Sequence, residues 1–374
     1  MGDRGPEPGL PAAFCIFPWV EQSFDIHGNL HLCNRSTAVL DAGGRPIALK
    51  NPGDLANIWN GPNMRSMRRQ MLTGELPVIC GRCISMEREG RESKRQEYLS
   101  NLPPWSPAPR DMIAATEDDG STPLHPVSFE LRTSNLCNAK CVTCSPEFST
   151  SLIGDHRKLK SEAPESHRLA RKIYQKVAHP KDNWAVSAGV YDDLKTNMDR
   201  VRLLYFSGGE PLMIPPNTDL VDYCIDSGHA ENVSLVYDTN ALPISEEWLR
   251  RWDHFERVEI RISIDGLGDK FDYIRFPGPF QTFERAAKLL ADWNNPKARV
   301  TSQTTVSLLN ILDLVDIFKW YWSVFGRESV IEKRLFFKDL RDPEALSLLK
   351  IPDVVYVEAI SKLEGLARDL RQEL

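Results

Sequence analysis

Beyond Pro126, short apolar runs rich in β-branched residues alternate with stretches in which apolar residues recur every three or four positions. Runs of the first kind predict strands, and stretches of the second kind predict helices. The predicted strands are Val127–Arg132, Val201–Phe206, Val233–Asp238, Val258–Ile264, Val300–Ser307 and Val330–Phe337. The predicted helices between them are Asn217–Asp226, Ser245–Trp252, Phe283–Asn294 and Ile311–Phe325. Because this alternation is typical of parallel sheets, we expect an α/β fold, a partial (β/α)6 TIM-like barrel, with a flat doubly wound sheet as the alternative.

The pattern before Pro126 is different. Residues 1–98 are rich in turn residues and contain one strong helical stretch, Met64–Thr73, which indicates a small separate module. The arginines of this stretch (Arg65, Arg68 and Arg69) are expected to be solvated. Residues 99–126 contain six prolines and no periodic pattern, which predicts a linker. We therefore expect a module at 1–98, a linker at 99–126, the barrel at 127–340 and terminal helices at 341–374.

The composition narrows the class of protein. The 374 residues are 41% hydrophobic, enough for a sizeable core, and 46 Lys and Arg against 52 Asp and Glu leave a net charge of −6. A negative chain lacks the broad positive field that attracts nucleic acid, so we expect no nucleic-acid partner. No apolar run approaches the roughly 20 residues of a membrane-spanning helix, and the start has no leader pattern. We expect a soluble, cytoplasmic protein without a membrane partner.

The eight cysteines are clustered along the chain. They make up about 2% of the residues, well below the share typical of a small disulfide scaffold. They form a group of four, a group of three and one residue alone: Cys15, Cys33, Cys80 and Cys83; Cys137, Cys141 and Cys144; and Cys224. In a cytosolic chain this spacing favours metal ligation.

The group of three directly follows the first predicted strand, where α/β folds place their chemistry. Three thiolates can surround one metal centre and leave one coordination position for a group that is not protein. A zinc site completed by a distant residue is the alternative. The pattern C-x3-C-x2-C resembles the signature of the radical S-adenosylmethionine (radical SAM) superfamily. The resemblance implies that Cys137, Cys141 and Cys144 ligate a [4Fe-4S] cluster that binds S-adenosylmethionine, whose reductive cleavage forms a 5′-deoxyadenosyl radical.

One position departs from the superfamily pattern. An aromatic residue often precedes the last cysteine, but here Thr143 does, which puts its packing on the adenine in doubt.

A second motif ends the second predicted strand. It consists of Ser207, Gly208, Gly209, Glu210 and Pro211. This sequence resembles the superfamily's GGEP motif, and the resemblance implies contact with the methionine end of the cofactor. Glycines permit close backbone approach, and Glu210 can accept from an ammonium group.

Further polar residues lie at later strand ends. Thr239, Asn240 and Ser263 resemble residues that bind the cofactor, with ordinary turn chemistry as the alternative. The candidate catalytic residues are Glu130, Arg132, Tyr237, Asp238, Asp265 and Arg275. If the strand register is as predicted, Glu130 and Arg132 face the barrel lumen and can contact substrate; if it is shifted by one residue, they are charges on the outer face. A surface salt bridge is the alternative for Arg275.

The group of four resembles the twitch module, the half-size relative of the SPASM domain, with pattern C-x(9–15)-G-x4-C followed by C-x2-C. Gly28 stands at the required position between Cys15 and Cys33, and Cys80 and Cys83 form the final pair. The resemblance implies an auxiliary [4Fe-4S] cluster, with a four-thiolate zinc site as the alternative. The module here precedes the barrel, as in a subgroup of radical SAM proteins. The stretches that resemble this subgroup outside the barrel motifs are Phe14–Trp19, Ile58–Asn60, Met71–Cys83, Ser93–Arg95 and Tyr237–Asn240.

These resemblances imply an enzyme that removes a hydrogen atom from an unactivated carbon. We expect a hydroxylated, carbohydrate-like small molecule that is epimerised or oxidised by two electrons, with a flavodoxin- or ferredoxin-type electron donor. Modification of a ribosomally made peptide is the alternative, and a zinc or iron–sulfur scaffold is the non-enzymatic one. Cys224 shares a helix face with Leu220, so we expect a core thiol rather than a hydrogen-atom donor.

Overall fold

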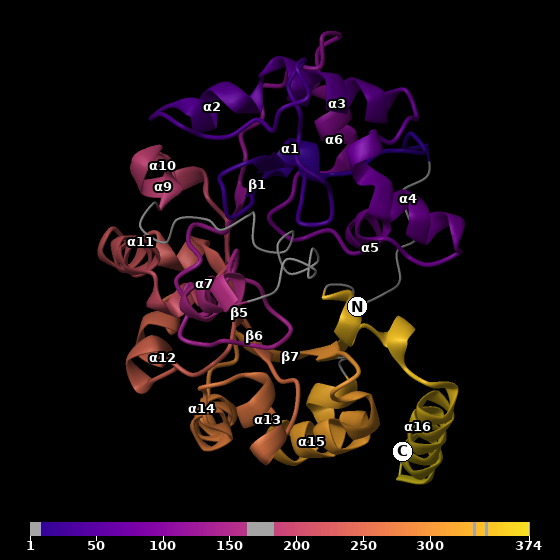
Figure 1. The fold of residues 1–374 in the computed structure, drawn as a ribbon. Coiled ribbons are helices and arrows are strands. Elements are labelled where there is room, and N and C mark those ends of the chain that lie inside the picture. Colours follow the sequence, from indigo (N-terminus) through magenta and orange to yellow (C-terminus); the bar gives the residue numbers. More distant parts are fainter. Residues whose placement is uncertain (1–8, 163–182, 332–333, 341–342, 374) are drawn as a thin grey trace. The chain divides into compact units, whose positions relative to one another are not determined.

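The computed structural model describes residues 9–162, 183–331, 334–340 and 343–373 (Figure 1). Its internal contacts divide the chain into two units, which are described separately. The first unit contains Met1–Ser134, Lys181–Gly208 and Asp219–Leu235. The second contains Asn135–Pro180, Gly209–Thr218 and Val236–Leu374. The predicted domain boundaries at 98, 126 and 340 stay predictions.

The first unit is built on four strands in the order β2-β1-β3-β4. Their bounds are β1 (Glu21–Phe24), β2 (Leu30–His31), β3 (Ser128–Leu131) and β4 (Leu203–Phe206). β1 runs antiparallel to β2 and parallel to β3, and β3 runs parallel to β4. The sequence predicted β3 and β4 but not β1, which brings the start of the chain into the same sheet.

Short helices surround these strands. They are α1 (Phe17–Val20), α2 (Asp54–Trp59), α3 (Pro62–Leu72), α4 (Gly81–Arg88), α5 (Lys94–Ser100), α6 (Pro109–Ala114), α9 (Trp184–Ser187) and α10 (Val190–Thr196). The predicted helical stretch Met64–Thr73 corresponds to α3. The other helices before Pro126 were missed, because four to eight residues are too few to show a helical period.

The segment predicted as a linker contains α6 and packs against α2. The indole of Trp59 donates to the carbonyl of Leu124 at 2.6 Å, and the amide side chain of Asn60 donates to Thr122 at 2.9 Å. The expectation that Arg68 is solvated is wrong. Its guanidinium is fully buried and donates to backbone carbonyls of Pro18, Trp59 and Gly120 and to the side-chain oxygen of Asn60.

The second unit contains parallel strands β6 (Arg257–Ser263), β7 (Ala298–Val306) and β8 (Leu335–Asp339), in that order. β5 (Ser234–Thr239) begins in the first unit and ends in the second. The α/β class with parallel strands is thus confirmed. The predicted start of the last strand at Val330 is wrong, because α15 (Leu314–Ile331) continues through this position. A short apolar run fits a buried helix as well as a strand.

Helices cover one face of these strands. They include α12 (Glu246–Trp252), α13 (Gly268–Ile274), α14 (Phe280–Asp292) and α15. An aromatic cluster joins α13 to α14, with Phe271 and Phe283 rings 4.8 Å apart. α7 (Leu152–Glu162) follows the cysteine loop, and α11 (Pro215–Asp226) spans the division between the units. The expected two terminal helices are instead two short 3-10 turns and one long helix, α16 (Asp353–Glu373), within the described residues.

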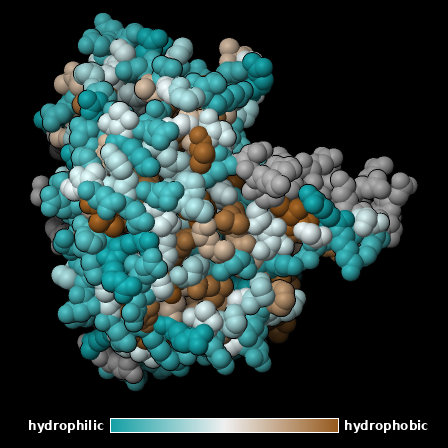
Figure 2. Space-filling view, turned by 90° about the vertical axis from the view of Figure 1, so that its left-hand side faces the viewer, coloured by the Kyte–Doolittle hydropathy of each residue, from teal (hydrophilic) through white to brown (hydrophobic). Residues whose placement is uncertain are grey.

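The face of the molecule drawn in Figure 2 is mostly hydrophilic, with small apolar areas interrupted by polar ones. Within the described ranges, none of the helices combines the length and apolar character that crossing a membrane requires.

Candidate functional site

Cys137, Cys141 and Cys144 lie on an irregular loop in the second unit. The residues that follow the loop hold its first half. Ser149 Oγ donates to the carbonyl of Ala139 at 2.6 Å, and Ser151 Oγ donates to the carbonyl of Cys137 at 2.7 Å. These hydroxyls replace the regular backbone ladder that an irregular loop lacks.

The chain after α13 holds the second half of the loop. The backbone amides of Lys140 and Val142 donate to the carbonyls of Phe276 and Ile274, at 2.5 and 2.9 Å. The loop is therefore fixed by two segments, one that follows the cysteine motif directly and one more than 120 residues later in the sequence.

Burial raises the pKa of the three thiols, to about 11 at Cys137 and to about 12 at Cys144. At Cys141 the Arg275 guanidinium opposes this rise. Buried thiols of this kind are protonated near neutral pH, and a metal that binds them must displace their protons.

Arg275 lies directly after α13 and reaches the cysteine loop. Its Nη1 atom is 3.9 Å from the sulfur of Cys141, and its Nη2 atom donates to Asp265 Oδ2 at 2.7 Å. Asp265 is completely buried, and its other oxygen accepts from the backbone amide of Thr305 at 2.7 Å. The Nε atom of Arg275 is buried and has no hydrogen-bond partner among the described residues. An unused buried donor next to three thiols fits an anionic group bound at the loop.

The Ser-Gly-Gly-Glu-Pro turn is in contact with the same loop. A Cβ atom at Gly209 would lie 2.3 Å from the carbonyl oxygen of Leu136, so only glycine fits there. Gly208 has φ +113°, a backbone conformation that also favours glycine. Next to them, the amide of Glu210 donates to the same carbonyl of Leu136 at 2.7 Å. Ser207, the first residue of the turn, is buried, and Pro211 is buried at its end.

The Glu210 carboxyl group is completely buried. It accepts from Thr239 Oγ1 at 2.7 Å, from the backbone amide of Asn240 at 2.8 Å and from the amide of Leu212 at 3.2 Å. Burial raises the pKa of Glu210 to about 7, against these hydrogen bonds. The Asn240 side chain donates to Asn138 at 2.6 Å and lies 4.0 Å from the sulfur of Cys137. The structure therefore brings Glu210, Thr239 and Asn240 together at the cysteine loop.

A row of polar side chains continues along β5 to β8. Gln303 donates to Asp238 at 3.1 Å and pairs with Lys338, while Arg261 lies 3.8 Å from Asp238. Ser263 is partly exposed on β6, in register with Gln303. On β6 the alternate residues Val258, Ile260 and Ile262 are fully buried. This face is therefore the polar one, and the opposite face packs under the helices.

The structure does not bring Tyr237 to this polar row. Its ring is fully buried against Trp252 and Trp248, with centroids 5.5 and 6.1 Å away. Asp238, the next residue, is partly exposed, as expected when neighbouring strand residues point to opposite faces.

In the first unit, the buried Glu130 forms an ion pair with the partly exposed Arg132, with an Nη2–Oε1 distance of 2.7 Å. Ser23 on β1 also donates to Glu130, at 2.8 Å, and Ser128 donates to Glu21 at 3.1 Å. Although burial opposes it, Arg132 holds the pKa of Glu130 below its usual value. Burial raises the pKa of Glu21 to about 7. Glu21 was missed by the sequence analysis because β1 was missed.

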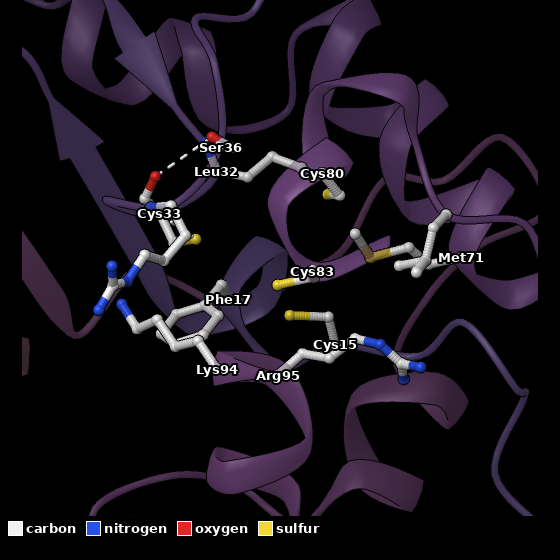
Figure 3. A pocket seen from close by; sticks show the side chains of 12 residues that line it. Cys15, Phe17, Leu32, Cys33, Ser36, Met71, Cys80, Cys83, Lys94 and Arg95 are labelled. Atoms are coloured by element: carbon white, nitrogen blue, oxygen red, sulfur yellow. Dashed lines mark hydrogen bonds between the residues drawn. The ribbon is translucent and has the colours of Figure 1, made fainter. Parts of the chain in front are cut away.

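A second thiol site lies in the first unit. One pocket is lined by all four cysteines of the N-terminal group, together with Phe17, Lys94 and Arg95 among others (Figure 3). The four cysteines come from the segment before α1, the bend after β2, and the start of α4 with the turn before it. Gly28, which the pattern requires, has φ +76°, and a Cβ atom there would lie 2.8 Å from the Trp184 ring.

The thiols of this pocket influence one another. Burial and then the nearby Cys33 raise the pKa of Cys15, and the same two causes raise that of Cys80 to about 12. Burial also raises the pKa of Cys33, which Lys94 opposes. Among the described residues, no group of three or more His, Cys, Asp or Glu side chains has the arrangement of a single-metal site.

Comparison with known proteins gives a family match. The model of the Radical SAM superfamily matches residues 131–321, just over half of the chain. The mycofactocin maturase MftC of Mycobacterium ulcerans (strain Agy99) is 28% identical over 136 residues, 36% of this chain and 36% of that protein. MftC of Mycobacterium tuberculosis (strain ATCC 25618 / H37Rv) is 31% identical over 114 residues, 30% of this chain and 28% of that protein. The match thus spans about a third of the length of these curated relatives.

Two solved structures are similar at low scores. Streptococcus suis SuiB bound to S-adenosylmethionine has 14% identity and a TM-score of 0.38, covering 83% of this chain and 63% of that chain. Native anSMEcpe with bound AdoMet has 17% identity and a TM-score of 0.37, covering 57% of this chain and 51% of that chain.

Proposed function

Because this chain belongs to the radical SAM superfamily, we propose that it is an enzyme that uses S-adenosylmethionine to remove a hydrogen atom from its substrate. Membership implies S-adenosylmethionine and one [4Fe-4S] cluster as cofactors. When bound, they supply a 5′-deoxyadenosyl radical as the oxidant. The residues of the chain bind the cofactors, exclude water and orient the substrate.

The single observation that carries this proposal is the convergence of three thiols, Glu210 and Arg275 on one loop of the second unit. Three thiolates suit a cluster with one iron left for the cofactor. The buried Glu210 carboxylate is suited to the amino group of S-adenosylmethionine, and the unused Nε of Arg275 to a carboxylate. Thr239, Asn240 and Ser263 are proposed cofactor contacts, and Ser207, Gly208, Gly209 and Pro211 shape the turn that approaches the loop.

We propose that the four-thiol pocket of the first unit holds an auxiliary [4Fe-4S] cluster. Four sulfurs line one pocket, which supports a four-thiolate cluster, and zinc is the competing metal. Anaerobic reconstitution followed by metal and sulfide analysis separates them. Iron and sulfide near eight each per chain support two clusters, whereas stoichiometric zinc in the pocket contradicts the proposal.

The substrate that the polar row supports best is a hydroxylated, carbohydrate-like small molecule, which would be epimerised or oxidised by two electrons. Asp238, Gln303, Arg261 and Lys338 present both donors and acceptors on a partly exposed strand face, which suits hydroxyl groups. Asp238 and the pairs Glu130–Arg132 and Asp265–Arg275 are the proposed catalytic residues. A flavodoxin- or ferredoxin-type protein would deliver the electron.

A peptide substrate is the second candidate. β8 pairs only with β7 among the described strands, and Phe336 and Phe337 on it are 41% and 42% exposed. An exposed edge strand can bind an extended peptide through its backbone. The relatives named maturases are consistent with this candidate.

The experiment that tests the function replaces Cys137, Cys141 and Cys144 with Ala. We expect the variant to lose one cluster and all formation of 5′-deoxyadenosine under reducing conditions. Cys224→Ala is the matched control, because this cysteine lies in the buried core of the first unit next to Met198 and is expected to retain cleavage. Wild-type cleavage by the triple variant would contradict the proposal.

A further inference from the structure

Three cationic side chains line the four-thiol pocket: Arg35, Lys94 and Arg95. The three charges differ in how strongly a carboxylate or solvent compensates them. Arg95 is paired with Glu87 at 2.7 Å, so much of its charge is neutralised. Arg35 is partly exposed, and solvent screens its charge.

Lys94 is the pocket cation that is less exposed to solvent screening and has no close carboxylate partner in the described ranges. Its Nζ atom lies 4.1 Å from the ring centroid of Phe17 and 5.3 Å from that of Tyr98, and it donates to the neutral oxygen of Asn34 at 3.0 Å. The Phe17 ring itself lines the pocket (Figure 3). No carboxylate within the described ranges forms a close ion pair with Lys94.

The surroundings of Lys94 keep it charged. Although burial opposes it, the carboxylate of Glu21 and the thiol of Cys33 raise the pKa of Lys94 above its usual value. The same pocket is lined by Cys33 and the other three cysteines, so the cation and the four thiols share one site.

We propose that Lys94 is a positioning residue that raises the reduction potential of the cluster in this pocket, an inference that rests on the proposed auxiliary cluster. A cluster bound by four thiolates is negatively charged, and its reduction adds one electron and one more negative charge. A cation in the lining of the pocket stabilises the reduced form more than the oxidised form, because the Coulomb energy grows with the cluster's charge. Lys94 thereby makes this cluster a better electron acceptor.

The test uses the full-length chain with Cys137, Cys141 and Cys144 replaced by Ala, so that only the pocket cluster contributes. Iron and sulfide are measured first. The cluster is then titrated with dithionite and redox mediators, and the reduced form is quantified by electron paramagnetic resonance. In this background Lys94→Met and Lys94→Gln remove the charge, and Lys94→Arg keeps it. Lys50→Met is the matched control, because Lys50 is exposed and the change in formal charge is the same.

We expect Lys94→Met and Lys94→Gln to lower the ratio of reduced to oxidised cluster at a fixed potential about tenfold, a shift of about 59 mV for a one-electron couple. Lys94→Arg should restore most of this ratio, and Lys50→Met should change it less than about twofold, because solvent screens an exposed charge. The inference is overturned if the neutral variants that retain the cluster titrate like Lys50→Met. If the background protein binds no iron and sulfide, the auxiliary cluster itself is refuted, which is a different failure.

Discussion

The buried Asp265–Arg275 pair makes a quantitative prediction about the cysteine loop. Asp265 is completely buried and the Arg275 side chain is 10% exposed, so solvent does little to compensate either charge. Replacing Arg275 with Met removes the guanidinium that pairs with this buried carboxylate. The carboxylate of Asp265 then keeps the hydrogen bond that it accepts from the Thr305 amide. Breaking one side of a buried pair costs about 3–5 kcal/mol, and we expect about 3 because this amide remains.

Replacing both partners should cost much less. In Asp265→Asn/Arg275→Met no buried charge remains, and the neutral amide can still accept from Thr305. A lost hydrogen bond of this kind costs about 1 kcal/mol. The free energy of unfolding of the double variant should therefore be about 2 kcal/mol higher than that of Arg275→Met. Urea unfolding followed by tryptophan fluorescence measures this, since Trp248, Trp252 and Trp293 pack in the same unit. A double variant as unstable as Arg275→Met would refute the reasoning.

The same variant tests the contact with the loop. Arg275 lowers the pKa of the Cys141 thiol, so its removal should slow alkylation of Cys141 in the protein before cluster assembly. Arg275→Lys is the control that keeps the charge. Equal alkylation rates in the unchanged protein, Arg275→Met and Arg275→Lys would show that the Arg275 guanidinium, 3.9 Å from the Cys141 sulfur, has no electrostatic effect on it.

Three further predictions concern single sites. Burial raises the pKa of Glu210 from 4.5 to about 7, so the folded protein binds this proton more tightly than the unfolded chain does. The raised pKa therefore stabilises the fold by up to about 3 kcal/mol below pH 4.5, and this stability is lost as the pH rises through 7. Glu210→Gln should flatten the dependence of the free energy of unfolding on pH. Cys80→Ala/Cys83→Ala should lower iron and sulfide from about eight to about four each, retain formation of 5′-deoxyadenosine and lose product; normal turnover without this cluster would show that it is structural at most. Cys224→Ala should lower the free energy of unfolding by about 1 kcal/mol, because its buried sulfur lies 3.7 Å from the sulfur of Met198, and the variant should still form product. If oxidised or quenched substrate accumulates instead, Cys224 is the hydrogen-atom donor.

Most of the strands that follow Pro126 were predictable because they carry their own signal, the start of the last one excepted. A run such as Val258–Ile264 alternates buried aliphatic residues with polar ones, and β6 shows this alternation. β1 has no such signal, since three of its four residues, Glu21, Gln22 and Ser23, are polar. It becomes a strand by pairing with β3, more than 100 residues later, where Ser23 donates to Glu130. A single-sequence pattern does not contain that pairing.

The candidate site divides in the same way. The spacing of the cysteines and the Gly-Gly-Glu turn are local, and the structure brings Gly209 against the cysteine loop. The approach of Arg275 to Cys141 joins residues 134 positions apart. Arg68, expected in solvent, is buried for the same kind of reason: its acceptors are backbone carbonyls as far away as Gly120. A charged residue is by default assigned to the surface, so sequence patterns miss buried charges that belong to no recognised motif, such as Glu21 and Arg68. Buried charges persist only where partner groups compensate them. The buried charged side chains of this chain, together with their partners, are therefore the first candidates for groups that position a cofactor.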